Sequence, residues 1–292
     1  MNLKKWKKSS IEELKENKFY SGDDIFWLET IIDKLLEKYN LTSDAEIDDE
    51  LDKTLNSDLN KLLQGQPIEQ ILGYTYFYSV KIGVYPDVLI PRPDSETMIE
   101  TIKDYIPYLK SLRQRSTNEE INILEIGIGS GALSICLAKL LDSYGINYKI
   151  LASDISSAAI SASSKNIQAH ELGEKINVEL ADLWPSEVVQ GNYKIDLLLS
   201  NPPYISESEI EDESMLEFEP KIALIADNDG LELYDRIFIE AKKYLNCGAL
   251  VFLEHGHEQK QALINLAKKN YNYIKTEKDL GSRDRISVFI NN

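Results

Sequence analysis

The chain has 292 residues, a length that suits one large α/β domain or a catalytic domain with a smaller companion. Hydrophobic residues make up 43% and aromatic residues 9%, which is typical of a folded protein and excludes disorder over most of the chain. The 32 Lys and Arg against 49 Asp and Glu give a formal net charge of -17. Such a charge repels phosphate backbones, so a broad nucleic-acid-binding surface is excluded and no stable nucleic-acid partner is expected.

The basic start, residues 1–10, is followed by Glu12 and Glu13 rather than by an apolar stretch. Neither a secretory signal nor a mitochondrial presequence is therefore predicted, and no run of about 18 apolar residues would span a membrane. Cys136 and Cys247 lie far apart in apolar neighbourhoods and are expected to be reduced and buried. These features predict a cytoplasmic protein without membrane contact, and we expect a monomer.

The sequence pattern over residues 1–73 predicts a small helical domain. Apolar residues at helical spacing over 21–39 indicate an amphipathic helix with a cap candidate at Ser21. A second helix is predicted from a capping box that begins at Ser43 and from a leucine face over 51–63. Gly and Pro residues end this helix, so the helical domain closes near residue 73.

Residues 74–92 predict a β-hairpin connector, because aromatic and β-branched residues alternate before the rigid Ile-Pro-Arg-Pro run at 90–93. In the remaining domain, 93–292, strands alternate with helices that start near Gly131, Ser156 and residue 230. Strands are predicted over 121–126, 148–153, 176–180, 194–200, 249–254, 271–276 and 285–290. This alternation predicts an α/β fold with a mostly parallel, doubly wound sheet, whose ligands bind beyond the carboxyl ends of the strands.

The first predicted strand of this sheet runs into a glycine turn, Glu125-Ile-Gly127-Ile128-Gly129-Ser130-Gly131. Glycines let the backbone approach a ligand closely, and the following helix offers free N–H groups. The spacing G-x-G-x-G with an acid ahead of it differs from the dinucleotide fingerprint G-x-G-x-x-G, and a carboxylate suits a cationic ligand better than a pyrophosphate. By itself the turn is also compatible with an ordinary strand-to-helix connection.

Asp154 ends the next predicted strand, at the distance where an acid binds two ribose hydroxyls. A ribose together with a positive charge favours S-adenosylmethionine as cofactor, with S-adenosylhomocysteine as product. Asp182 follows the third strand, where a carboxylate reaches the adenine amino group, although a surface-loop acid is an equally good interpretation. Leu183 and Trp184 are candidates for the wall beside the adenine ring.

Asn201-Pro202-Pro203-Tyr204 follows the fourth predicted strand. Two prolines make the loop stiff and leave its carbonyls free to accept hydrogen bonds. The Asn201 side-chain oxygen and the Pro202 carbonyl suit the two hydrogens of a planar NH2 group, against which the Tyr204 ring can pack. Holding both hydrogens exposes the nitrogen lone pair for methyl transfer, so catalysis consists of alignment and of acceptors that strengthen as positive charge develops. The alternative is an ordinary Asn-Pro turn.

With these motifs the sequence resembles class I S-adenosylmethionine-dependent methyltransferases, and most closely the release factor glutamine methyltransferases. The resemblance covers the connector and nearly the whole catalytic part. Besides the glycine turn, Asp154 and 201–204, it rests on 65–73 (GQPIEQILG), 77–78 (FY), 89–96 (LIPRPDSE), 219–220 (EP), 229–231 (DGL) with Tyr234, 253–256 (LEHG), 278–280 (KDL) and 283–285 (RDR).

The resemblance implies a seven-stranded catalytic domain joined by a hairpin to a helical, substrate-recognising domain, and methylation of the glutamine amide in the Gly-Gly-Gln loop of peptide chain release factors. Asn201, Pro202 and Tyr204 would be catalytic, and Pro203 would join them in binding the substrate. Leu183 fills a position that is often aromatic in the family, so either Leu183 or Trp184 is expected beside the adenine. With the acids discussed above, the expected cofactor contacts are Glu125, Gly127, Ile128, Gly129, Ser130, Gly131, Asp154, Asp182, Leu183 and Asn201.

Two other substrates share this catalytic corner. A ribosomal-protein glutamine methyltransferase usually has Pro-Arg-Ser-Pro in the connector, whereas this chain has Pro-Arg-Pro-Asp at 91–94. A nucleic-acid adenine methyltransferase predicts basic, aromatic surfaces near the pocket, whereas seven acids lie within 207–219. These acids suggest an acidic rim that guides a basic protein loop. His255 and His257 have no matching Cys or acid cluster, so no metal site is expected.

Overall fold

The computed structural model describes residues 2–41, 45–115, 120–207 and 218–292, without the side chains of 113–115. The chain divides into two compact units, Met1–Thr75 and Tyr76–Asn292. The division falls within the short hairpin of β1 (Tyr74–Phe77) and β2 (Val80–Gly83), close to the predicted connector. Among the described residues, no helix combines the length and the apolar composition needed to cross a membrane.

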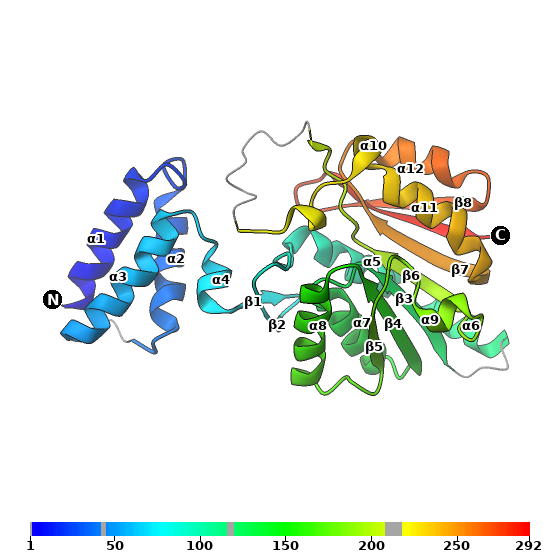
Figure 1. Ribbon diagram of the computed structural model, residues 1–292, viewed down its shortest axis with the longest axis horizontal. Coiled ribbons are helices and arrows are strands. Elements are labelled where there is room, and N and C mark those ends of the chain that lie inside the picture. Colours follow the sequence, from blue (N-terminus) through cyan, green and yellow to red (C-terminus); the bar gives the residue numbers. More distant parts are fainter. Residues whose placement is uncertain (1, 42–44, 116–119, 208–217) are drawn as a thin grey trace. The chain divides into compact units, whose positions relative to one another are not determined.

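The first unit is a cluster of helices around an apolar core. Trp6, Leu14, Leu28, Leu35 and Leu55 are among its fully buried side chains, and each comes from an apolar stripe at helical spacing. The helices are α1 (Leu3–Glu16), α2 (Ile25–Glu37), α3 (Asp49–Leu63) and α4 (Ile68–Leu72). Figure 1 shows them in blue and cyan.

Both predicted helix caps in this unit lie too early in the sequence. The cap of α2 is Asp24, whose carboxylate accepts the Phe26 N–H at 2.8 Å, so Ser21 stays in the preceding turn. The cap of α3 is Asp48, whose side chain accepts the Leu51 N–H at 2.8 Å. Ser43 itself lies outside the described residues. In both cases the cap is an aspartate directly before the first helical residue.

The second unit contains the predicted seven-stranded sheet, in the order β5-β4-β3-β6-β7-β9-β8 (Figure 1). The first five strands in this order are parallel, and β9 runs antiparallel to both of its neighbours. This confirms the predicted fold class. The strands are β3 (Ile121–Ile126), β4 (Tyr148–Asp154), β5 (Ile176–Leu180), β6 (Ile195–Ser200), β7 (Leu245–Glu254), β8 (Tyr271–Lys278) and β9 (Asp284–Asn291).

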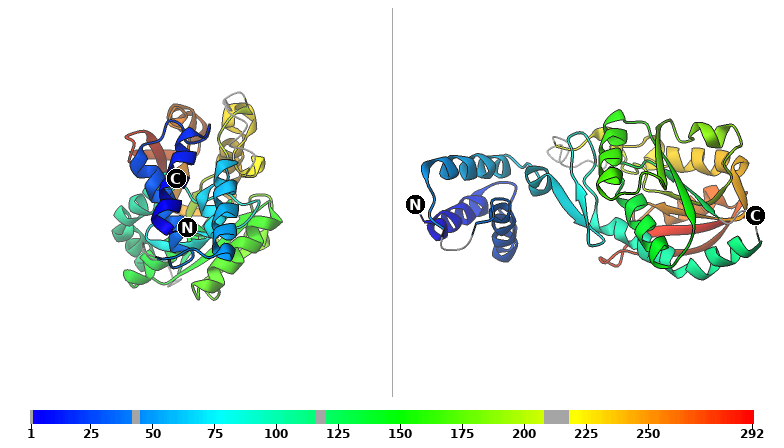
Figure 2. Two further views of the ribbon diagram at one scale, coloured as in Figure 1. Left: turned by 90° about the vertical axis from the view of Figure 1, so that its left-hand side faces the viewer. Right: turned by 90° about the horizontal axis from the view of Figure 1, so that it is seen from below.

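Helices cover both faces of this sheet, as the two views in Figure 2 show. Successive residues of a strand point to opposite faces, so Leu197 and Leu199 join one core while Leu198 joins the other. The first core is covered by α5 (Glu96–Asp104), α6 (Ile106–Arg115), α7 (Ala132–Ser143) and α8 (Ser157–Ala169). The second is covered by α9 (Ser186–Val189), α11 (Glu232–Glu240) and α12 (Lys260–Ala267), and α10 (Asp227–Gly230) precedes α11.

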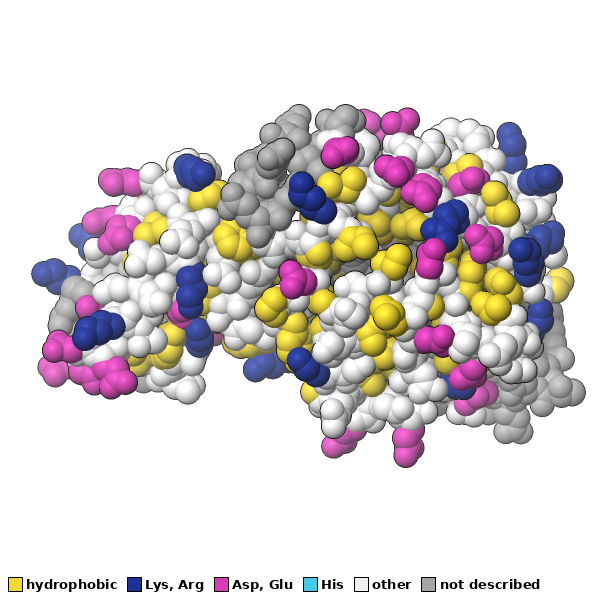
Figure 3. Space-filling model, in the orientation of Figure 1, with side chains coloured by type: hydrophobic (Ala, Val, Ile, Leu, Met, Phe, Trp, Pro, Cys, Tyr) yellow, Lys and Arg dark blue, Asp and Glu magenta, His cyan; other side chains and the backbone are white. Residues whose placement is uncertain are grey.

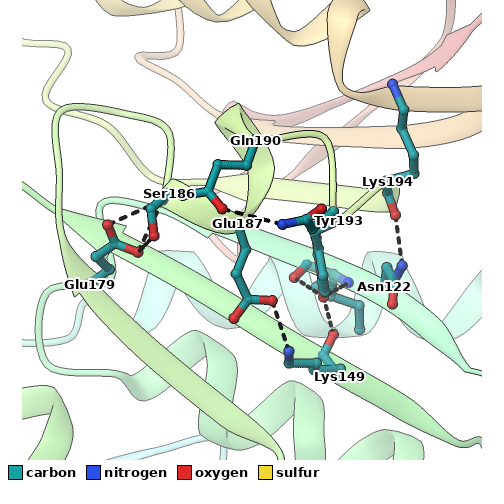
Figure 4. A network of polar contacts seen from close by, with 10 residues as sticks. Asn122, Lys149, Glu179, Ser186, Glu187, Gln190, Tyr193 and Lys194 are labelled. Atoms are coloured by element: carbon teal, nitrogen blue, oxygen red, sulfur yellow. Dashed lines mark hydrogen bonds and ion pairs between the residues drawn. The ribbon is translucent and has the colours of Figure 1, made fainter.

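A network of polar contacts lies at the amino-terminal ends of β3 and β6 (Figure 4). The Tyr193 hydroxyl donates to the Lys149 carbonyl at 2.6 Å and accepts the Ile123 N–H at 2.9 Å. The Asn122 side chain donates to the Lys194 carbonyl at 2.8 Å. These bonds satisfy backbone groups at the start of the sheet, which leaves the carboxyl edge of the strands for a ligand site.

The two thiols differ in their surroundings. Cys136 is buried in α7, as predicted, whereas Cys247 is exposed. The prediction for Cys247 was wrong because this residue lies in the first part of β7, before the regular pairing with β6 that starts at Leu250.

Candidate active site

The glycine turn connects β3 to α7 through three glycines with positive φ angles. The φ angle is +75° at Gly127, +54° at Gly129 and +85° at Gly131. A residue with a Cβ atom loses about 1–2 kcal/mol in such a conformation, which explains the glycine at each position. The Gly127 and Ile128 N–H groups both donate to the Ser153 carbonyl, at 2.8 and 3.0 Å. The turn is therefore held against the end of β4.

Asp154 ends β4 beside this turn. One of its carboxylate oxygens accepts the Gly129 N–H and the other accepts the Ser156 N–H, both at 2.9 Å. Burial raises the pKa of Asp154 above its usual value, although these two hydrogen bonds act in the opposite direction. The hydrogen bonds fix the direction of the carboxylate, and each oxygen keeps a lone pair for a ligand.

A cavity of about 340 Å³ opens at the carboxyl edge of the sheet. Its wall includes the ends of β3, β4 and β6, the connector residues 87–89, the segment 220–227 and the start of α11. A volume of this size suits a small organic ligand. Of the predicted site residues, the cavity is lined by Gly127, Gly129, Asp154, Asp182, Leu183, Asn201, Pro202 and Pro203.

Glu125 lies outside this wall. Its side chain is 1% exposed, and the carboxyl accepts a hydrogen bond from the Ser134 hydroxyl of α7. Burial raises the pKa of Glu125 to about 8, so the group is largely protonated at neutral pH. This arrangement differs from the prediction that Glu125 presents a negative charge to the ligand.

The remaining residues of the turn support the wall from behind. Ile128 is 3% exposed and packs in the core on the α7 side of the sheet. The Ser130 carbonyl accepts from the Asn166 side chain at 2.8 Å. A Cβ atom on Gly131 would stand 3.3 Å from the Ser163 Cβ, so this glycine lets α7 pack closely on α8. None of these three lines the cavity.

The loop after β5 contributes Asp182 and Leu183 to the wall. The Asp182 carboxylate forms an ion pair with Arg236 of α11 at 2.8 Å, and Arg236 also lines the cavity. Leu183 is 5% exposed and has a φ angle of +67°. Trp184 instead packs on Tyr244, with ring centroids 4.9 Å apart. Between the two residues predicted to wall the adenine, the cavity is lined by Leu183 and not by Trp184.

The Asn-Pro-Pro-Tyr corner is anchored at both ends. The Ser200 hydroxyl donates to the Ile126 carbonyl at 2.7 Å, which ties the end of β6 to the end of β3. The Asn201 Nδ2 donates to the Ser95 hydroxyl at 3.0 Å. At the far end, the Tyr204 carbonyl accepts from the Gln259 side chain at 2.9 Å.

Two acceptors of this corner have no donor among the described residues. Within the part of the chain that the structure describes, no protein group donates to the Asn201 Oδ1 or to the Pro202 carbonyl. Both residues line the cavity. Both acceptors therefore belong to residues of the cavity wall, and an NH2 group requires two acceptors.

Tyr204 is half-buried and does not line the cavity. The Arg285 guanidinium lies 3.3 Å from its hydroxyl, and burial raises the pKa of Tyr204 to about 12. Tyr204 is therefore the one residue of the corner outside the cavity wall, and its predicted contact with a substrate stays a prediction.

The segment after the corner carries the predicted acidic rim. Residues 208–217, with five of the seven acids, lie outside the described residues. Glu219 is described, and it is not a rim residue: it is 8% exposed, and its carboxylate accepts the Ile90 N–H at 2.9 Å and pairs with Arg92. A buried carboxylate needs such partners, and these tie the segment after the corner to the connector.

The charge of the cavity is negative. In the described part of the chain its wall carries one basic side chain, Arg236, against five acids: Asp87, Asp154, Asp182, Asp227 and Glu232. Such a wall favours a ligand with a positive charge. Figure 3 shows a face of the molecule on which hydrophobic side chains gather over the larger unit, with charged side chains among them. Residues 87–88, 222–227 and Arg236, which also line the cavity, lie outside the motifs that the sequence analysis identified, so sequence reasoning missed them.

The chain is similar in sequence and in fold to known methyltransferases. The methyltransferase small domain family matches residues 108–221. A release factor glutamine methyltransferase of Francisella tularensis is 34% identical over 87% of this chain and 84% of its own length. The protein of the same name from Clostridium acetobutylicum is 31% identical over 94% and 92%. The N-terminal domain of human METTL16 in complex with SAH is similar in fold, with a TM-score of 0.50 at 16% identity over 94% of this chain and 97% of that domain.

Proposed function

Because the chain belongs to the release factor glutamine methyltransferase family, we propose that it methylates the glutamine amide in the Gly-Gly-Gln loop of peptide chain release factors. The methyl donor in this proposal is S-adenosylmethionine. The observation that carries the proposal is a pair of acceptors in residues of the cavity wall, the Asn201 Oδ1 and the Pro202 carbonyl, to which no described group donates. They match the two hydrogens of a primary amide.

The residues of the cavity fit the cofactor. A Cβ atom placed on Gly129 would meet no atom within 4 Å, so ligand atoms can lie directly on the glycine turn. Asp154 would hold the ribose hydroxyls, and Leu183 would pack against the adenine. The acids of the wall favour a sulfonium. When bound, S-adenosylmethionine supplies a methyl group on a positively charged sulfur and leaves as S-adenosylhomocysteine.

The corner residues act on the other reactant. An amide nitrogen is a weak nucleophile, since its lone pair is delocalised into the carbonyl group. The Asn201 Oδ1 and the Pro202 carbonyl would accept its two N–H groups, turn the lone pair toward the methyl group and become stronger acceptors as the nitrogen gains positive charge. The nitrogen then loses one proton to water, and the neutral N-methyl amide remains. Pro202 and Pro203 keep the loop rigid, and Tyr204 would pack against the amide plane.

For the helical unit, residues 1–73, we propose recognition of the protein substrate. Its support is a group of exposed apolar side chains at the start of α2, where Ile25, Phe26 and Trp27 are 55%, 74% and 46% exposed. Contiguous exposed apolar side chains mark interaction surfaces.

The test is incubation of the protein with radiolabelled S-adenosylmethionine and a release factor. We expect label in the release factor and none in a variant whose Gly-Gly-Gln glutamine is replaced by Ala. Ribosomal proteins and DNA are incubated in parallel, because they are the substrates of the two alternative activities. Equal label in the Gln→Ala variant, or label in DNA only, contradicts the proposed substrate.

A further inference from the structure

The buried carboxyl group of Glu254 lies next to Asn201. Glu254 ends β7, whose register with β6 pairs Leu253 with Ser200. The following residues, Glu254 and Asn201, are therefore neighbours at the carboxyl edge of the sheet. Glu254 is only 1% exposed, and among the described residues nothing forms a hydrogen bond with its Oε2 atom. A buried carboxyl oxygen without a partner is costly and calls for a functional explanation.

Several elements present polar groups to this carboxyl. Asp94 and Ser95 come from the 3₁₀ turn Pro93–Ser95 that precedes α5, Arg285 comes from β9, and Asn201 and Tyr204 come from the corner. Tyr234 of α11 also faces it, and the Tyr234 hydroxyl donates to the Glu254 carbonyl at 2.7 Å. Burial raises the pKa of Glu254 to about 7, while the neighbouring Ser95 and Asn201 side chains and the charge of Arg285 oppose this rise.

The Asn201 amide group has two N–H donors to place. One of them goes to the Ser95 hydroxyl at 3.0 Å, and the Glu254 carboxyl lies beside the same amide. We propose that Glu254 is a positioning residue that, together with Ser95, holds the NH2 group of Asn201 away from the cavity and so presents its Oδ1 to the substrate amide. This inference rests on the proposed function only for the identity of that substrate.

The arrangement also links the acceptor strength of Asn201 to ionisation. An ionised Glu254 attracts the N–H of the Asn201 side chain more strongly than a neutral Glu254 does. This attraction polarises the Asn201 amide and makes its Oδ1 more negative. The Oδ1 then stabilises the positive charge on the attacked nitrogen better. Since the carboxyl ionises as pH rises through about 7, kcat should rise over the same range.

A test that needs no substrate is NMR spectroscopy of the full chain labelled with ¹⁵N at asparagine, with the Asn201 signals identified by their loss in Asn201→Ala. We expect the side-chain NH2 signals of Asn201 to move with a midpoint near pH 7 and to stop moving in Glu254→Gln. The matched control is Asp196→Asn, which neutralises a carboxyl at the start of β6 that accepts from Asn122 and Asn246. In the Asp196→Asn variant, the NH2 signals of Asn201 should move with pH as they do in the wild type.

Kinetics provide the second readout. Glu254→Gln should lower kcat roughly tenfold or more with an unchanged KM for S-adenosylmethionine, and should flatten the pH profile of kcat. If Glu254→Gln does not fold, the wild-type titration of the Asn201 signals decides alone. Asn201 signals that stay constant between about pH 5.5 and 8.5 overturn the inference. A release factor that is not methylated by wild-type protein contradicts the proposed function and leaves the NMR result standing.

Discussion

Gly230 is the glycine at which an added methyl group should be most damaging. It has a φ angle of +74°, and a Cβ atom there would stand 2.0 Å from the Tyr204 carbonyl oxygen and 2.6 Å from the Gln259 Nε2. A carbon and a carbonyl oxygen need roughly 3.3 Å, so the Tyr204 carbonyl must move by about 1 Å in Gly230→Ala. That carbonyl belongs to the corner that holds the two proposed substrate acceptors.

The expected cost has two parts. The left-handed conformation costs about 1 kcal/mol in a residue with a Cβ atom, and overpacking costs about 1–3 kcal/mol. We therefore expect Gly230→Ala to lower the free energy of unfolding by about 3 kcal/mol. A displacement of about 1 Å in the corner that carries the substrate acceptors should also lower kcat about a hundredfold. Urea unfolding and initial rates of methyl transfer to a release factor measure the two effects.

Gly191→Ala is the matched control. Gly191 has a φ angle of +78°, and a Cβ atom there would meet nothing within 4 Å. Its substitution should cost about 1 kcal/mol of stability from the backbone alone and leave the rate unchanged. The reasoning is refuted if Gly230→Ala methylates at the wild-type rate, or if the two variants lose equal stability.

Three further predictions concern the acids and the amide of the site. Asn201→Ala should keep the fold and lower kcat about 10²–10³-fold, because one acceptor for the developing charge is lost; initial rates and thermal unfolding measure this. Asp154→Asn should weaken S-adenosylmethionine binding about tenfold or more by calorimetry, since hydrogen bonds to a charged acceptor are lost. Glu125→Gln should change how stability depends on pH. Its carboxyl binds a proton more tightly in the folded state, with a pKa of about 8 against 4.5. Wild-type stability should therefore fall as pH rises between these values, and the Gln variant should gain up to about 1.4 kcal/mol per pH unit relative to it in urea unfolding.

Each of these expectations has an opposite result. Full activity in Asn201→Ala would remove its role as acceptor, and unchanged cofactor affinity in Asp154→Asn would separate Asp154 from the ribose. A stability difference between wild type and Glu125→Gln that is constant from about pH 5 to 8 would mean that Glu125 is ionised in the folded state.

The sheet could be predicted closely from the sequence. The strands at 121–126 and 176–180 match their predicted bounds, because short β-branched apolar runs bounded by turn residues leave few other places to begin and end. Helix starts were less predictable, as Asp24 and Asp48 show. Ser, Thr, Asp and Asn are all good caps, so residue type alone does not choose among neighbouring candidates.

The parts of the site that follow the ends of strands could be predicted from the sequence. The contacts between side chains from distant segments could not. The glycine turn and Asn201 follow the ends of strands, so their meeting at one edge follows from a parallel sheet. In contrast, Glu219 was predicted at an exposed rim and is buried against Arg92, 127 positions away in the chain. The pairing of Asp182 with Arg236 and the buried position of Glu125 likewise depend on contacts between distant segments, which single-sequence patterns do not encode.

The most direct measurement of the central claim is mass spectrometry of a release factor after incubation with the protein and S-adenosylmethionine. Fragmentation of the peptide that contains the Gly-Gly-Gln loop locates any added methyl group. The account predicts one methyl group on the side-chain amide of that glutamine, absent when the incubation uses Asn201→Ala. An unmodified glutamine after incubation with active, cofactor-binding protein, or a methyl group on another residue, would contradict it.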